Sequence, residues 1–258
     1  MAAQPDLSKL TVGQFAERFR SEMIPLSNTF SYFCASVPLS EEDLKEYLEE
    51  PIAALPPAIA AQLPKISIML VPYLERGEGK EKGDLTRNEF VCTEKPPEHR
   101  LSWATQVGFD QEEVLLFALK EQDVSEYHYR FYHVLAGLIE RSCQDGAEAQ
   151  YASLLREELG AGVHGEVDEE SWHMKQGLLR RQTNVRKETK VFRDYLRQSF
   201  IDTLTLYLHG ICCDIDVETG PRQLPSRYLR KRLNLLHGLF PPPSGYAVLP
   251  EHQSGSVS

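Results

Sequence analysis

The sequence contains no apolar run that approaches the roughly 20 residues needed by a membrane-spanning helix. Its first six residues, Met-Ala-Ala-Gln-Pro-Asp, include neither the basic segment nor the apolar segment of a secretion signal. From these two absences we expect a soluble protein of the cytoplasm that does not insert into a membrane.

Cysteine is scarce and odd in number, and no two cysteines have the C-x-x-C spacing of a zinc or redox motif. The five are Cys34, Cys92, Cys143, Cys212 and Cys213. An odd set spread over the chain is typical of reduced thiols and not of a disulfide framework. We therefore expect no disulfides, and we interpret the cysteines as small buried apolar residues.

Motifs that identify a reaction are also absent, including G-x-S-x-G, H-E-x-x-H, the phosphate-binding loop and the kinase signatures. Residues 160–165, Gly-Ala-Gly-Val-His-Gly, do match the G-x-G-x-x-G pattern of dinucleotide-binding proteins. That pattern binds pyrophosphate only where it follows a buried strand. Here it follows a predicted helix, so we interpret it as a turn between helices.

What the chain does have is the composition of an ordinary folded protein, with 41% hydrophobic and 26% charged residues. The formal net charge of −10 is divided unevenly. Residues 175–258 contain 13 Lys and Arg against 7 Asp and Glu, a balance of +6, which leaves −16 for residues 1–174. The basic part can therefore pack against the acidic part of the same chain, or bind an acidic partner.

The most regular pattern in the chain covers residues 168–213. Asp168 can cap a helix that has acidic residues in its first turn, and apolar residues recur at helical spacing over residues 192–211. We predict a long helix at residues 169–213 with one buried face. Residues 180–190 contain a single strongly apolar residue, so this middle section is either a solvated helix or a break.

Other segments predict both helices and strands. Residues 10–37 have apolar residues near helical spacing, which predicts an opening helix with a kink at Pro25. Residues 65–71 are compact and β-branched, and residues 101–107 alternate between apolar and polar, so both predict strands. Residues 114–119 are apolar on both faces and predict a further strand, with a helix as the alternative.

These patterns together predict a helix-dominated α+β fold. We expect a helical bundle with a long helix in the last third of the chain, and a small antiparallel sheet near residues 66–120. The bundle helices are expected at residues 123–141, 147–159, 169–213 and 226–237. We expect a single globular domain over residues 1–250, made of a helical and small-sheet part at 1–120 and the bundle at 121–240, with a disordered tail at 251–258.

The helix expected at residues 123–141 is apolar nearly all round and carries a single polar row. Three residues of that row, Glu126, Arg130 and His133, are candidates for acid–base chemistry. A carboxylate and an arginine in apolar surroundings would tune the pKa of the histidine. The alternative is a satisfied polar seam between packed helices.

Glu170 and His173 have the Glu-x-x-His spacing of helical di-iron and di-manganese sites, so they are candidate ligands for a transition metal. Such a site needs two of these pairs, and the chain contains no second one. Acidic residues in the first turn of a helix, which favour its positive end, explain Glu170 without a metal. We therefore expect no cofactor, with a transition metal as the alternative.

Basic residues gather in two segments of the last third of the chain. We expect them to bind a protein partner through the residues Arg180, Arg181, Arg186, Lys187, Lys190, Arg227, Arg230 and Lys231. Nucleic acid is a poorer partner, because these residues lack interleaved aromatic residues and belong to an acidic protein.

Two functional hypotheses follow. The first is an intracellular protein–protein interaction or regulatory protein that uses the basic helical surface. The second is an enzyme with a metal site or a histidine and carboxylate site inside the bundle, built from Glu126, His133, Glu170 and His173.

Overall fold

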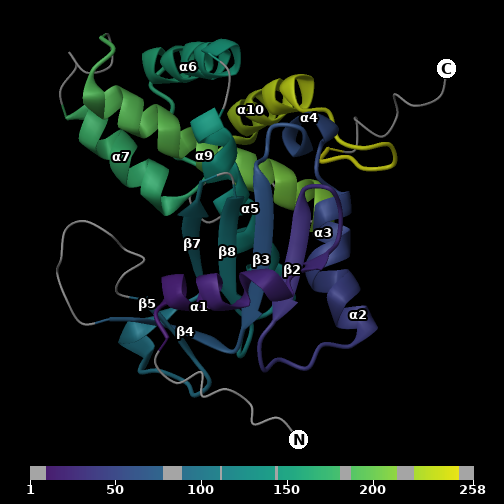
Figure 1. Cartoon of the computed structure of the whole chain (residues 1–258). Coiled ribbons are helices and arrows are strands. Elements are labelled where there is room, and N and C mark those ends of the chain that lie inside the picture. The colour runs from purple at the N-terminus through teal and green to yellow at the C-terminus, as the bar shows by residue number, and fades with distance from the viewer. Residues whose placement is uncertain are drawn as a thin grey trace, which may run out of the picture. The chain divides into compact units, whose positions relative to one another are not determined.

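The computed structural model describes residues 10–77, 89–110, 112–142, 145–180, 187–213 and 224–249 (Figure 1). The chain divides into two compact units, each formed by two stretches of sequence. The first unit comprises Met1–Glu49 and Leu63–Phe131, and the second comprises Glu50–Gln62 and Tyr132–Ser258. The expectation of a single domain stays a prediction. Cys143 and the predicted tail at residues 251–258 lie outside the described residues.

The first unit contains a five-stranded mixed sheet. In spatial order its strands are β1 (Ile24–Pro25), β2 (Phe30–Cys34), β3 (Lys65–Val71), β8 (Glu112–Ala118) and β7 (Ala104–Phe109). Strands β2, β3 and β8 are parallel to one another, whereas β1 and β7 at the edges run antiparallel to their neighbours. Every residue of β3 after Lys65 is buried, which is typical of a central parallel strand covered on both faces.

Helix α1 (Val12–Phe19) packs on this sheet. Thr11 caps it, because its hydroxyl accepts the Gln14 N–H at 3.3 Å while the Gln14 side chain accepts the Thr11 N–H at 3.1 Å. Its buried residues Val12, Phe15 and Ala16 belong to one apolar cluster with the sheet residues Met69, Val71, Val114, Leu116 and Ala118.

The predicted helix at residues 10–37 is right for α1 and wrong beyond it. After the 3₁₀ turn η1 (Arg20–Glu22), the chain enters β1 and then β2. Pro25 has no backbone N–H and ends any helix there. Strand β2 pairs along its whole length with β3, and that pairing outweighs a weak helical spacing.

A three-stranded antiparallel sheet completes the first unit, in the order β5 (Glu89–Cys92), β4 (Tyr73–Arg76) and β6 (Leu101–Ser102), with the 3₁₀ turn η4 (Glu98–Arg100) before β6. The predicted strand at residues 101–107 is thus divided between the two sheets, and residues 114–119 form most of β8 and not a helix. The sheet expected near residues 66–120 is in fact two sheets, and the larger is mixed and begins at residue 24.

Between β2 and β3 the chain forms short helical segments, which are α2 (Glu41–Leu44), the π-helix η2 (Lys45–Glu49), α3 (Glu50–Ala53) and α4 (Pro57–Ala60). Prolines at positions 51, 56, 57 and 64 keep them short. Helix α5 (Val124–Ser142) agrees with the helix predicted at residues 123–141. It begins in the first unit and continues in the second from Tyr132.

The rest of the second unit is helical and confirms the helix-dominated α+β class. Its long helices are α6 (Asp145–Gly160), α7 (Glu169–Leu179), α9 (Lys190–Cys213) and α10 (Ser226–Leu239). Helix α9 is the long helix of the last third, and the face predicted to be apolar from Phe192 to Ile211 is buried.

Residues 169–213 do not form one continuous helix. Helix α7 ends at Leu179, and α9 begins at Lys190, where the Thr189 hydroxyl accepts the Phe192 N–H at 3.2 Å. Of the two alternatives for this middle section, the break is the correct one. It allows α7 to lie alongside α9, so that both helices bury apolar residues that a single rod would expose (Figure 1).

Candidate functional site

The most unusual feature of the second unit is a group of charged side chains without access to solvent. Arg232, Glu158, Glu166 and Lys175 are each at most 1% exposed. They come from α10, α6, the turn before α7, and α7 itself. Two cations thus balance two carboxylates, as the protein interior requires. We call these four residues the Arg232 cluster.

Arg232 lies at the centre of the cluster and contacts both carboxylates. Its Nε donates to Glu158 Oε1 at 3.0 Å and its Nη2 to Glu158 Oε2 at 2.5 Å. Towards Glu166, Nη1 donates to Oε2 at 2.7 Å and Nη2 to Oε1 at 3.0 Å. Both contacts are bidentate, which is the strongest arrangement of an arginine with a carboxylate.

Glu166 receives further donors besides Arg232. Lys175 Nζ lies 3.2 Å from its Oε1, and the Tyr195 hydroxyl donates to the same oxygen. Burial alone would raise the pKa of Glu166, but Arg232 and Lys175 outweigh burial and lower that pKa to about 2. Glu166 is therefore ionised at neutral pH.

A glycine-rich turn brings Glu166 into the cluster. Gly162 and Gly165 have φ values of 67° and 83°, in the region that favours glycine. Asp168 then caps α7 by accepting the first backbone N–H of that helix. The segment at residues 160–165 is thus the interhelical turn that we predicted.

The described surroundings of the cluster are closely packed. The Tyr151 hydroxyl lies 3.4 Å from Arg232 Nη1. A cavity that reaches Tyr151 has a volume of about 20 Å³, enough for one water molecule. We infer that the Arg232 cluster holds its helices together.

The sequence-based prediction does not include this cluster, because it treats the basic residues near the end of the chain as a surface and does not consider Arg232 separately. Yet Arg232 falls on the stripe of α10 that also contains Leu229, Leu233 and Leu236, at helical spacing. A charged residue on an inward stripe needs a buried partner of opposite charge, and that was the signal available in the sequence.

A second polar group lies where α9 meets the start of α7. Asp202 is 2% exposed and accepts hydrogen bonds from the Ser171 N–H at 3.3 Å and from Gln198 Nε2 at 2.8 Å. Burial raises the pKa of Asp202 to about 6, because it outweighs these hydrogen bonds. Asp202 therefore changes its charge close to neutral pH.

The three predicted acid–base residues lie on α5 in different surroundings. Glu126 is exposed and lies 3.4 Å from Arg130, whose guanidinium covers the Trp103 ring at 4.9 Å. His133 belongs to the second unit, where its Nδ1 lies 3.4 Å from Thr205 Oγ1. Burial lowers the pKa of His133. An acid–base role for these residues stays a prediction.

The predicted metal ligands Glu170 and His173 are both exposed, in the first turns of α7. His173 Nε2 lies 3.3 Å from Glu169 Oε1, so the carboxylate beside this histidine is Glu169. Burial lowers the pKa of His133, and the negative charge of Glu170, another residue of the enzyme hypothesis, raises it by less. Neither the metal site nor the enzyme hypothesis is tested by these contacts, and both stay predictions.

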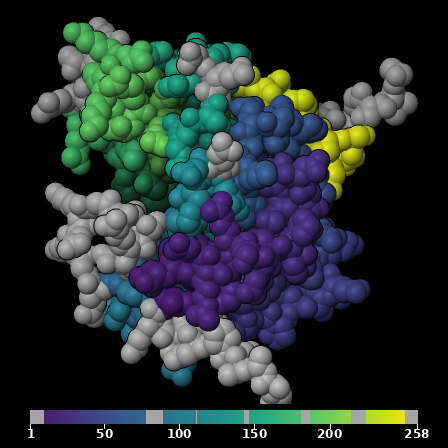
Figure 2. Space-filling model, viewed as in Figure 1, coloured from purple at the N-terminus to yellow at the C-terminus, as the bar shows by residue number. Residues whose placement is uncertain are grey.

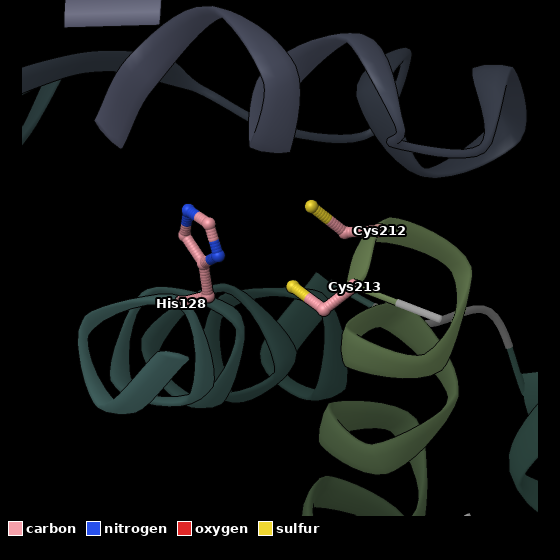
Figure 3. A group of neighbouring side chains, drawn as sticks. All are labelled: His128, Cys212 and Cys213. Atoms are coloured by element: carbon pink, nitrogen blue, oxygen red, sulfur yellow. The ribbon is translucent and has the colours of Figure 1, made fainter. Parts of the chain in front are cut away.

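Three further residues have side chains of the types that bind metal ions, namely His128, Cys212 and Cys213 (Figure 3). His128 belongs to the first unit, where its Nε2 lies 2.8 Å from the Glu46 backbone oxygen. The two cysteines are consecutive at the end of α9 in the second unit.

The cysteines that the structure describes are free thiols with intermediate exposure, which are Cys34, Cys92, Cys212 and Cys213. The absence of disulfides among them agrees with the prediction. The prediction that the cysteines are buried is wrong for these four, because each is partly exposed. Burial raises the pKa of Cys34 and of Cys92 to about 11, so these two thiols are protonated at neutral pH.

The first unit has a surface hollow of about 580 Å³ beside its three-stranded sheet. The two cations that line it already have partners. Arg100 Nη2 lies 2.9 Å from Glu75 Oε1, and Lys95 Nζ lies 2.5 Å from Glu121 Oε2. The hollow has the volume of a small-ligand site, but its cations are engaged by neighbouring carboxylates.

No known protein family, no curated protein and no solved structure matches this chain. Within the ranges that the structure describes, no helix combines the length and the apolar character needed to cross a membrane.

Proposed function

We propose that this protein is an intracellular interaction or regulatory protein whose second unit binds an acidic segment of a protein partner. The binding residues are those predicted from the sequence, and we call them the basic surface. Its described members are Arg180, Lys187, Lys190, Arg227, Arg230 and Lys231. Arg181 and Arg186 also belong to the prediction but lie outside the described residues.

The observation that carries this proposal is that the last turns of α6 contact both basic segments. Arg156 lies 4.6 Å over the Phe192 ring, near the start of α9, and 3.6 Å from Glu188. The next residue, Glu157, pairs with Lys231 of α10 at 2.7 Å. Basic residues that are far apart in the sequence therefore lie around one end of α6, and Arg156 adds to them.

Exposure and rigidity also support the proposal. Lys187, Lys190, Arg227 and Lys231 are exposed, and Figure 2 shows the segments around them at the surface, in green and yellow. On the same helix as Arg227, the buried Arg232 ties α10 to α6 and to Glu166. A helix held in this way loses little conformational entropy when a partner binds.

An acidic peptide fits the basic surface better than a nucleic acid does. Glu157 and Glu188 lie within this surface and would repel a continuous row of phosphates, whereas a peptide has its carboxylates at intervals. Stacking on bases needs exposed aromatic rings. Tyr228 is only 8% exposed and lies 4.5 Å from the Arg227 guanidinium, so its ring is covered.

A Lys190→Glu and Arg227→Glu double variant should bind a fluorescent oligo-glutamate peptide about tenfold more weakly than the natural protein. Each exposed ion pair contributes roughly 0.2–1 kcal/mol, and each reversed charge adds repulsion, so two reversals reach the 1.4 kcal/mol of a tenfold change. Fluorescence anisotropy at low ionic strength measures this affinity, which should fall as salt is added.

The matched control is an Arg18→Glu and Lys65→Glu double variant, which changes the net charge equally at exposed positions of the first unit. Its affinity for the peptide should stay within about twofold of the natural protein. Equal losses in the two double variants would mean that only net charge matters and would contradict the proposal. Tighter binding of duplex DNA than of the peptide would contradict it too, in favour of a nucleic-acid partner.

A further inference from the structure

Helix α9 ends in two consecutive thiols, Cys212 and Cys213 (Figure 3). Their sulfur atoms lie within 4.8 Å of each other. Both side chains are partly exposed and neither forms a disulfide. The two sulfurs are therefore accessible and close enough to share one ligand.

The charges around this pair in the second unit favour a cation. The negative charge of the Glu50 carboxylate, at the start of α3, opposes the deprotonation of both thiols. The C-terminal end of a helix has a partial negative charge, and α9 ends at Cys213. Two thiolates at this position would be repelled by both sources of negative charge unless a cation lay between them.

We propose that Cys212 and Cys213 bind one thiophilic divalent cation of the zinc class through both sulfurs, at a position where the negative charge of Glu50 favours the ion. Thiolate sulfur selects such ions over magnesium or calcium. Binding breaks two S–H bonds and forms two metal–sulfur bonds, both protons pass to solvent, and no electron is transferred.

The present geometry needs little change to accept the ion. Zinc–sulfur bonds of about 2.3 Å in a tetrahedral arrangement set two sulfurs roughly 3.8 Å apart. The sulfurs of Cys212 and Cys213 already lie within 4.8 Å of each other, so small rotations of the side chains suffice. Water completes the four ligands at this partly exposed position.

The test titrates the reduced, full-length protein with Cd²⁺, which takes the same ligands as Zn²⁺ and gives an ultraviolet absorption band when it binds thiolate. We expect one equivalent of Cd²⁺ per chain, a sulfur band, and its displacement by Zn²⁺. Cys212→Ser and Cys213→Ser should each weaken Cd²⁺ binding by at least about tenfold, since even an outer contact of a metal site contributes 10–100-fold. Glu50→Gln should weaken binding and keep the sulfur band.

The control variants are Cys34→Ser and Cys92→Ser, which remove partly exposed thiols of the first unit and should bind Cd²⁺ unchanged. Circular dichroism confirms that each variant is folded. A sulfur band of full intensity in either variant of the α9 pair would overturn the proposal. So would the absence of a sulfur band in the natural protein, even if it bound zinc through oxygen and nitrogen ligands.

Discussion

Replacing Arg232 by methionine should lower the free energy of unfolding by about 3–5 kcal/mol. Methionine keeps much of the aliphatic length of the side chain but removes its charge and its donors. The carboxylates of Glu158 and Glu166 would then stay buried with Lys175 as the remaining cation of the cluster. Chemical denaturation followed by circular dichroism measures the change.

Lys231→Met is the matched control for this prediction, because Lys231 is the neighbouring residue on α10 and its ion pair with Glu157 is exposed on both sides. Its effect should be at most about 1 kcal/mol. If Arg232→Met were no more destabilising than Lys231→Met, the Arg232 cluster would contribute little to stability and the structural role assigned to it would be wrong.

Asp202→Asn should stabilise the protein at pH 7.5 by up to about 3 kcal/mol and have little effect at pH 4. The pKa of Asp202 is raised to about 6 from an ordinary value of 3.8, mainly by burial. A carboxyl whose pKa is higher in the folded state favours folding below about pH 4, and this contribution is lost as the pH rises through 6. Asparagine resembles the protonated acid and avoids the loss.

Denaturation of both proteins at several pH values between 4 and 7.5 tests this dependence. Glu166 has the opposite behaviour, because its lowered pKa stabilises the folded state above its ordinary pKa and this is lost as the pH falls towards 2. That effect is common to both proteins and cancels in their difference. A difference that stays constant with pH would show that Asp202 is not the group that titrates.

The sequence predicts those parts of the fold in which local pattern and final packing agree. The buried residues of α9 recur at helical spacing, and the helix α5 is predicted from its capping residues and its long apolar segment. Strand β3 is compact and β-branched because it lies at the centre of a sheet. In these elements the hydrophobic period is a direct consequence of burial.

The predictions that are wrong concern segments whose local structure depends on a partner far away in the sequence. Strand β2 is a strand because β3 lies beside it, and their paired residues are about 36 positions apart. The break before α9 likewise depends on how α7 packs against it. Local propensity contains neither piece of information.

The Arg232 cluster could not be predicted for the same reason, because its residues come from distant parts of the sequence. Glu166 follows a glycine-rich turn and has no periodicity of its own, and its partner Arg232 lies 66 positions later. The sequence predicts the basic surface residues of α10, but it does not show which carboxylate of another segment contacts a buried arginine. Charge pairing across a fold has no signature in local spacing.

The central claim is that direct contact between Arg232 and Glu166 ties α10 to the helices around it, and so holds the basic surface in place. A double-mutant cycle with Arg232→Met and Glu166→Gln tests this claim most directly, because it isolates the energy of that contact from the effects of each substitution alone. We predict a coupling energy of about 2–3 kcal/mol in the free energy of unfolding. Additive effects, with a coupling below about 0.5 kcal/mol, would contradict the claim.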